Sequence, residues 1–183
     1  MSGPIAARRR GGVSEIASTT PLVIGVGNPH RGDDVFGLVV VRRLRPRLSE
    51  VGTVLEQEVG GAELLDVWTG RDRVWVVDAV RAGGAPGTIY RIEVGEEPLP
   101  ARLAISSSHG VSLAQAVALG QALHQLPVRL VIHGVEPAGF DTGDGLSPEV
   151  AAAVEPVARR IEEEVRGAVT VDRPVLSQGG PHA

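Results

Sequence analysis

Two aspartates and one histidine in this sequence have side chains that could together bind a metal ion or take part in catalysis. Asp34 follows the apolar run PLVIGVG, Asp78 closes the apolar run VWVVD, and His109 stands in SSSHG ahead of a helical pattern. Two carboxylates and an imidazole suit a divalent transition metal and leave coordination positions for water or substrate. These three residues are therefore the candidate site.

Each candidate also has a purely structural explanation. Asp33 or Asp34 can cap the helix predicted to follow them, and His109 can be a loop residue beside serines that cap a helix. Asp78 is harder to explain this way, because burying an unpaired carboxylate at the end of an apolar strand is costly. Their coincidence at predicted strand ends favours a shared site over three separate structural roles.

The elements that must position these residues follow from short apolar runs that alternate with helical periodicity between residues 21 and 168. We expect strands in PLVIGVG, VGTVLEQEV, VWVVDAV, TIYRIEV and LPVRLVIHGVEP. We expect helices after Asp34 to near Pro46, in GGAELLDVWTG, in VSLAQAVALGQAL, and from Pro148 through Glu164. The alternation predicts an α/β fold: a single-domain three-layer sandwich, with a mainly parallel sheet between helices and TIYRIEV antiparallel at an edge. In such sheets, ligands bind beyond the carboxyl ends of the strands.

Composition excludes several classes of protein. A net charge of −4 and a pI near 5.7 argue against a nucleic-acid partner. The absence of cysteine excludes disulfides, thiolate metal sites and a cysteine nucleophile. No apolar run approaches the ~20 residues of a membrane helix, and no apolar segment follows Arg8–Arg10 to form an export signal. We expect a cytoplasmic protein without a membrane partner.

The chain divides into three predicted segments. Residues 1–20 form a flexible arm, 21–170 the α/β domain, and 171–183 a flexible tail, because the polar, glycine- and arginine-rich ends carry no apolar periodicity. A monomer is expected, since a domain of this size can bury its own core and no stretch is typical of a dimer seam.

Three other motifs compete as sites. GVGNPHRG could cradle a phosphate, but its glycines miss the dinucleotide-binding spacing and no GK[ST] follows. SSSHG could suggest a serine nucleophile, yet adjacent Ser and His on one loop seldom reach triad geometry. His133 and Glu136 in HGVEP could line the same cleft, although a turn ended by Pro137 explains them better. None displaces the first site.

The chain resembles the hydrogenase maturation proteases, the endopeptidases that trim the large subunit of nickel-iron hydrogenases. The resemblance covers about residues 21–165, in order and at family-like spacing. The motifs that carry it are VIGVGNPHRGDDVFG, EVGGAELL, VWVVDAVRAGGAPGTIYRI, SSSHGVSLAQAVAL, HGVEP and GLSPEV.

The resemblance implies a twisted five-stranded sheet between helices and a protease that acts once nickel is in the precursor. It would remove a C-terminal extension from the hydrogenase large-subunit precursor, with nickel as the recognition signal. The nickel would be supplied by the substrate, although other divalent metals could occupy the site. The family's three metal-binding side chains fall on Asp34, Asp78 and His109, which leaves Asp33 as the helix cap. Some members carry Glu at the position of Asp34, and less polar residues are expected at that of His133.

Two functions remain open at this point. In an endopeptidase without cysteine, a carboxylate or His109 could serve as base for an activated water. If the metal arrives on substrate thiolates, it could instead position the scissile bond. The alternative from another class is a non-catalytic recognition module or chaperone for the nickel-loaded subunit, and only turnover separates it from a protease.

Overall fold

The structure is a computed structural model that describes residues 18–58, 61, 63–95, 113–140 and 145–171. Its elements follow in the order β1 (Leu22–Val26), a 3₁₀-helix (Gly32–Val35), α1 (Phe36–Leu48), β2 (Thr53–Gln57), α2 (Glu63–Trp68), β3 (Arg73–Ala79), β4 (Ile89–Val94), α3 (Leu113–Ala122), β5 (Arg129–Val135) and α4 (Pro148–Val171). All five predicted strands are present, and Pro148 begins the last helix as expected.

The strands form one sheet in the order β2-β1-β3-β5-β4. β1 pairs in parallel with β2 and with β3, and β3 pairs in parallel with β5. β4 runs antiparallel to β5 at the edge, as the short connection from β3 predicted. Because β2 and β3 lie on opposite sides of β1, the topological switch point is between β1 and β3, where open sheets bind ligands.

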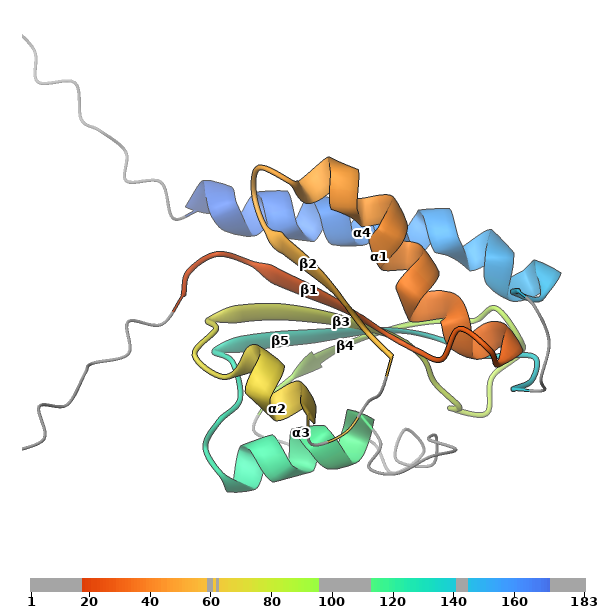
Figure 1. Ribbon diagram of the computed structural model, residues 1–183, viewed down its shortest axis with the longest axis horizontal. Coiled ribbons are helices and arrows are strands. Elements are labelled where there is room, and N and C mark those ends of the chain that lie inside the picture. Colours follow the sequence, from red (N-terminus) through yellow and green to blue (C-terminus); the bar gives the residue numbers. More distant parts are fainter. Residues whose placement is uncertain (1–17, 59–60, 62, 96–112, 141–144, 172–183) are drawn as a thin grey trace, which may run out of the picture.

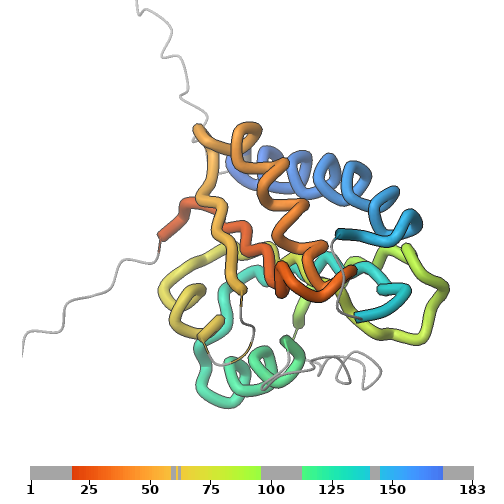
Figure 2. The backbone as a smooth tube through the Cα atoms, turned by 45° about the vertical axis from the view of Figure 1, so that its right-hand side comes forward, coloured from red at the N-terminus to blue at the C-terminus, as the bar shows by residue number. Residues whose placement is uncertain are grey.

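Helices cover both faces of the sheet, which confirms the three-layer α/β fold. Figures 1 and 2 show α1 and α4 on one side and α2 and α3 on the other. Alternate strand residues divide between the two cores: Val23, Trp75 and Val77 pack with α1 and α4, whereas Ile24 and Val76 pack with α2 and α3. Both faces of β1 and β3 are therefore buried, as their apolar runs predicted.

Two helices extend beyond their predicted ends. α1 continues through Pro46 to Leu48, and α4 continues past Glu164 to Val171. Leu48 and Val165 are fully buried in the same core, so packing stabilises the last turns. Pro46 lies close enough to the end of α1 that its missing N–H removes one hydrogen bond without ending the helix.

The first strand and α1 are in close contact through glycines. A Cβ on Gly25 would collide with the carbonyl oxygen of Gly37, and one on Gly37 would collide with carbonyl oxygens of Val26 and Val77. These glycines of the VIGVGNPHRGDDVFG motif therefore serve helix-to-sheet packing, which accounts for a glycine-rich turn without a phosphate.

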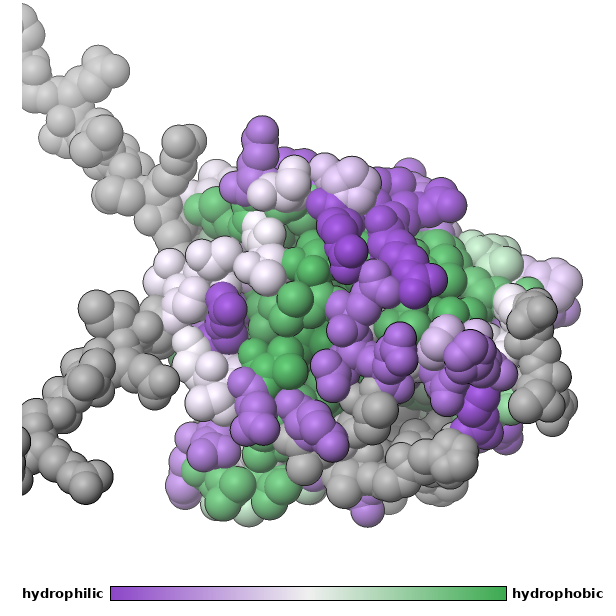
Figure 3. Space-filling view, viewed as in Figure 1, coloured by the Kyte–Doolittle hydropathy of each residue, from purple (hydrophilic) through white to green (hydrophobic). Residues whose placement is uncertain are grey.

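The surface on the α1 side is polar over the helix and apolar beside it. Figure 3 shows hydrophilic side chains gathered over α1 and an apolar area beside them. Arg42 and Arg45 of α1 both bind the Glu56 carboxylate of β2, with N–O distances of 2.8 and 2.9 Å. Within the described part of the chain, every helix is too short or too polar to cross a membrane.

Candidate functional site

Asp34 and Asp78 lie at the switch point of the sheet. Asp78 is the second-to-last residue of β3 and pairs with Gly134 of β5. Asp34 is in the 3₁₀-helix that follows β1. β1 and β3 are parallel neighbours, so both residues stand at the same edge. The Asp34 charge acts electrostatically on the Asp78 carboxyl, as expected for side chains that share one site.

The Asp78 carboxyl is buried, and burial disfavours its charged form. Its residue is 8% exposed. Burial raises the pKa of Asp78 well above its usual range and the negative charge of Asp34 raises it further, while a hydrogen bond with the Ala79 backbone opposes both. A divalent cation or a proton would stabilise this pair of carboxylates, because their negative charges repel each other and one of them is buried.

A tight backbone loop holds Asp34 beside β1. The Asn28 N–H donates to the Asp34 carbonyl at 3.1 Å, and the Asp34 N–H donates to the Arg31 carbonyl at 3.0 Å. The His30 N–H also donates to Asn28 Oδ1 at 2.9 Å. A Cβ on Gly27 would collide with the Asp34 carbonyl oxygen. The loop closes over a glycine because any side chain there would push Asp34 away.

Asp33 does not cap α1, contrary to the sequence prediction. The 3₁₀-helix places it before α1, whose N-cap is Val35. Its carboxylate is buried and accepts hydrogen bonds from the N–H groups of Ala138 (2.8 Å), Gly139 (3.4 Å) and Ser147 (2.7 Å), and from the Ser147 hydroxyl (3.0 Å). Asp33 thus fastens the segment after β5 to the loop after β1.

The third predicted residue, His109, lies outside the described residues. α3 begins at Leu113 and packs with Val74 and Val76 on one face of β3. Asp78 shares that face because strand residues alternate. Among the residues that the structure describes, no group of three histidine or acidic side chains could hold a metal. The two carboxylates fit a divalent cation as part of a ligand set that needs further donors.

The residues of the HGVEP motif have other roles. His133 is in β5, fully buried on the face covered by α4, and so faces away from Asp78. The Glu136 carboxylate accepts hydrogen bonds from the N–H groups of Ala82 (2.8 Å) and Gly84 (3.1 Å) and from the Tyr90 hydroxyl (2.8 Å). It therefore fastens the loop after β3 and is not a free group in the site.

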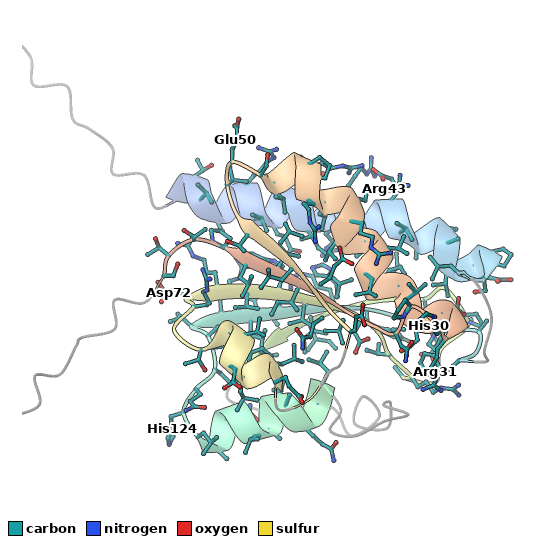
Figure 4. The ribbon with its side chains drawn as sticks, in the orientation of Figure 1. His30, Arg31, Arg43, Glu50, Asp72 and His124 are labelled. Atoms are coloured by element: carbon teal, nitrogen blue, oxygen red, sulfur yellow. The ribbon has the colours of Figure 1, made fainter. Side chains whose placement is uncertain are left out.

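Sequence reasoning missed a cationic group at the same edge. The guanidinium carbons of Arg31 and Arg81 lie 5.9 and 4.7 Å from the centroid of the Phe140 ring. Figure 4 shows Arg31 at the end of the sheet where β1 leads into α1. The feature of the sequence that could have pointed to these two arginines is their spacing from the aspartates: Arg31 precedes Asp34 by three positions, and Arg81 follows Asp78 by three.

Known proteins match this chain along most of its length. Residues 38–164 match the family described as hydrogenase maturation protease. The hydrogenase 2 maturation protease of Escherichia coli is 31% identical over 149 residues, which is 79% of this chain and 90% of that protein. The hydrogenase expression/formation protein HupD of Thiocapsa roseopersicina is 31% identical over 172 residues, 85% of this chain and 76% of that protein.

The fold matches solved structures as well. The hydrogenase maturating endopeptidase HybD from Escherichia coli aligns with a TM-score of 0.70 and 28% identity, covering 82% of this chain and 94% of HybD. The match supports the fold of a five-stranded, mostly parallel sheet with helices.

Proposed function

This chain belongs to the hydrogenase maturation protease family, and we propose that it is the endopeptidase that removes the C-terminal extension of a nickel-iron hydrogenase large-subunit precursor. Nickel already inserted in the precursor is the recognition signal. One observation carries the proposal: the buried Asp78 carboxyl stands beside the charge of Asp34 at the switch point, and burial and that charge both raise its pKa. A pair of carboxylates that a cation would stabilise fits a protease that acts only on a metal-loaded precursor.

Asp34, Asp78 and His109 are the side chains that we assign to the metal and to the reaction. The precursor's nickel, when bound there, supplies a Lewis acid and a means of positioning the scissile bond. Asp34 and Asp78 are oxygen donors that suit a divalent cation, and His109 adds an imidazole. Nickel belongs to the substrate in this scheme, so the free protein needs no resident metal.

Peptide hydrolysis at this edge requires a base for water. A carboxylate of the pair, or the His109 imidazole, takes a proton as the water oxygen bonds to the scissile carbonyl carbon. The proton then passes to the leaving amine as the C–N bond breaks, so that a carboxylic acid and an amine are formed. Gly27 lets the loop after β1 pack closely against the Asp34 backbone. This packing holds Asp34 beside β1 and favours a single reacting geometry.

Intact mass spectrometry of a nickel-loaded precursor tests the proposal. We expect the unmodified protein to release a discrete C-terminal peptide, and nickel-free precursor to keep its full mass. Asp78→Asn should abolish release, whereas Glu164→Gln, a matched carboxylate-to-amide change in α4, should retain it.

Binding without loss of mass, for every large-subunit precursor of the same organism, would contradict the proposed protease and favour a recognition module. Equal cleavage of nickel-free precursor would contradict nickel as the recognition signal but would leave the proposed protease in place. Full activity of Asp34→Ala, Asp78→Asn and His109→Ala would remove the assigned site.

A further inference from the structure

Three loops bring Arg31, Phe140 and Arg81 together at the edge that holds Asp34 and Asp78. Arg31 follows β1, Arg81 follows β3 and Phe140 follows β5. Both guanidinium groups face the Phe140 ring, within the ~6 Å range of cation–π contact. We call these three residues the arginine–phenylalanine cluster. It is the part of the candidate site that carries positive charge.

The Arg31 guanidinium offers a buried hydrogen-bond donor, and Arg81 is an exposed residue. Among the described residues, Nη1 of Arg31 is buried and has no hydrogen-bond partner, and its Nη2 donates to the Phe140 carbonyl at the long distance of 3.5 Å. Neither Arg31 nor Arg81 has a carboxylate partner among the described residues. By contrast, Arg42, Arg47 and Arg91 each bind a glutamate within 3.0 Å. A buried, unpartnered guanidinium N–H is costly, so an anion at this position would be stabilised.

The cluster is held by the two buried carboxylates that have structural roles. Asp33 binds the N–H groups of Ala138 and Gly139, directly before Phe140. Glu136 binds the N–H groups of Ala82 and Gly84, directly after Arg81. The loops that carry the ring and the second arginine are thus fixed before any ligand arrives, which lowers the entropy lost on binding.

We propose that the arginine–phenylalanine cluster is a subsite that binds a carboxylate of the precursor's C-terminal extension, next to the scissile bond. The inference rests on the proposed function and adds a specificity determinant to it. The Phe140 ring lies within cation–π distance of both guanidinium groups, and a guanidinium in such a contact can still bind a carboxylate through its N–H groups. The source is either an Asp or Glu side chain of the extension or its terminal carboxylate.

This subsite complements the acidic pair. A metal-loaded segment of the precursor brings positive charge to Asp34 and Asp78, and the extension brings negative charge to Arg31 and Arg81. A peptide with the two charges in the opposite order would meet like charges at both places. The arrangement therefore sets the direction in which the peptide lies across the sheet edge.

Steady-state processing of the nickel-loaded precursor, followed by intact mass, tests the subsite. Arg81→Ala and Arg31→Ala should each raise KM roughly three- to tenfold with kcat within about twofold, as expected for a charge-assisted bond at a partly exposed site. Arg159→Ala removes an exposed arginine of α4 that has no ion pair among the residues that the structure describes. It is the matched charge control and should leave both constants unchanged. The wild-type KM should also rise with salt more steeply than that of Arg81→Ala.

The precursor supplies the second half of the test. If a side chain is the ligand, replacing each Asp and Glu of the extension by Asn and Gln should raise the wild-type KM and abolish the difference from Arg81→Ala. If the terminal carboxylate is the ligand, a synthetic extension peptide should lose Arg81-dependent binding when its C-terminus is amidated. Fluorescence anisotropy of that peptide measures binding without cleavage.

These readouts separate the subsite from the protease. Arg81-dependent peptide binding with no precursor cleavage by any variant would overturn the proposed function and support the subsite. Cleavage with KM values unchanged in Arg31→Ala and Arg81→Ala, or a KM change that persists with a neutral, amidated extension, would overturn the subsite and leave the protease in place.

Discussion

Asp78 is a buried carboxylate and Glu164 a partly buried one on the opposite face of the sheet, and their surroundings differ. Asp78, with 8% of its residue exposed, shares its site with the charge of Asp34. Glu164 belongs to α4, and its side chain, which is 16% exposed, contacts Trp75 and Arg91 of the sheet. The pKa of Asp78 is raised and that of Glu164 is lowered. Burial raises the pKa of both carboxyls, so it is their other neighbours that set the opposite directions of the two shifts.

The number and charge of the donors make the difference. Glu164 accepts hydrogen bonds from Trp75 Nε1 at 2.9 Å and Arg91 Nε at 2.8 Å. Burial alone would raise the pKa of Glu164, but the bonds from Arg91 and Trp75 outweigh it and lower the pKa to about 2. A carboxylate whose charge is already balanced stabilises the fold. One that faces another negative charge, as Asp78 does, is suited to binding a cation.

The largest effect that this comparison predicts is on processing by Asp78→Asn. We expect the rate to fall by roughly a thousandfold, because the amide removes an anionic ligand or base. The melting temperature should stay the same or rise, since the change removes a charge that is costly to bury. Intact-mass kinetics and calorimetry measure the two. A large loss of stability would show that Asp78 is structural, like Glu164.

Asp33→Asn tests the comparison between sequence neighbours. Its carboxylate accepts hydrogen bonds from the N–H groups of Ala138, Gly139 and Ser147, so an amide would set N–H against N–H and lower the free energy of unfolding by about 2–4 kcal/mol. Chemical denaturation measures this loss, and Asp34→Asn is the matched control, expected to lose processing with little change in stability. The reverse pattern would exchange the roles of the two residues.

Glu164→Gln should affect stability and spare processing. We expect a loss of about 1–3 kcal/mol at pH 7, because the hydrogen bonds from Arg91 and Trp75 lose their charged acceptor. The folded pKa is about 2 against 4.5, so the wild-type contribution is complete above pH 4.5 and is lost as the pH falls toward 2. Denaturation at pH 7 and pH 3 should show the wild type and the variant converging. An equal difference at both pH values would contradict this assignment.

His133→Leu should have the smallest effect, and its sign depends on pH. Neither ring nitrogen of His133 has a hydrogen bond within the described part of the chain, although Nε2 lies 3.5 Å from Glu164 Oε2, within ion-pair range. Burial lowers the pKa of His133, although the charge of Glu164 opposes it and those of Arg91 and Arg160 add to it. The wild type should lose stability as the pH falls below 6.5, because the unfolded chain binds the proton more readily.

The His133→Leu variant should lack that dependence and match or exceed the wild type by up to about 1 kcal/mol at pH 5.5. Urea denaturation at pH 7.5 and pH 5.5 measures it. A variant that is less stable than the wild type at pH 5.5 would show that the imidazole has a favourable partner.

The sequence by itself determined the α/β fold, the antiparallel edge strand and the positions of Asp34 and Asp78 at the ends of β1 and β3. Local apolar periodicity carries that information, because a buried strand and the residue that ends it are adjacent in the chain. The family resemblance was also legible in the ordered motifs, and the match over residues 38–164 confirms it. The roles of Asp34, Asp78 and His109 stay predictions.

Only the tertiary structure decided which acidic groups are already paired. Asp33 and Asp34 are adjacent and chemically identical in the sequence, yet Asp33 binds backbone groups more than 100 positions away. Glu164 likewise finds Trp75 and Arg91 across the sheet, and Arg31 and Arg81 meet at a ring from a third loop. Such partners are set by how the layers pack, and periodicity along the chain does not record them.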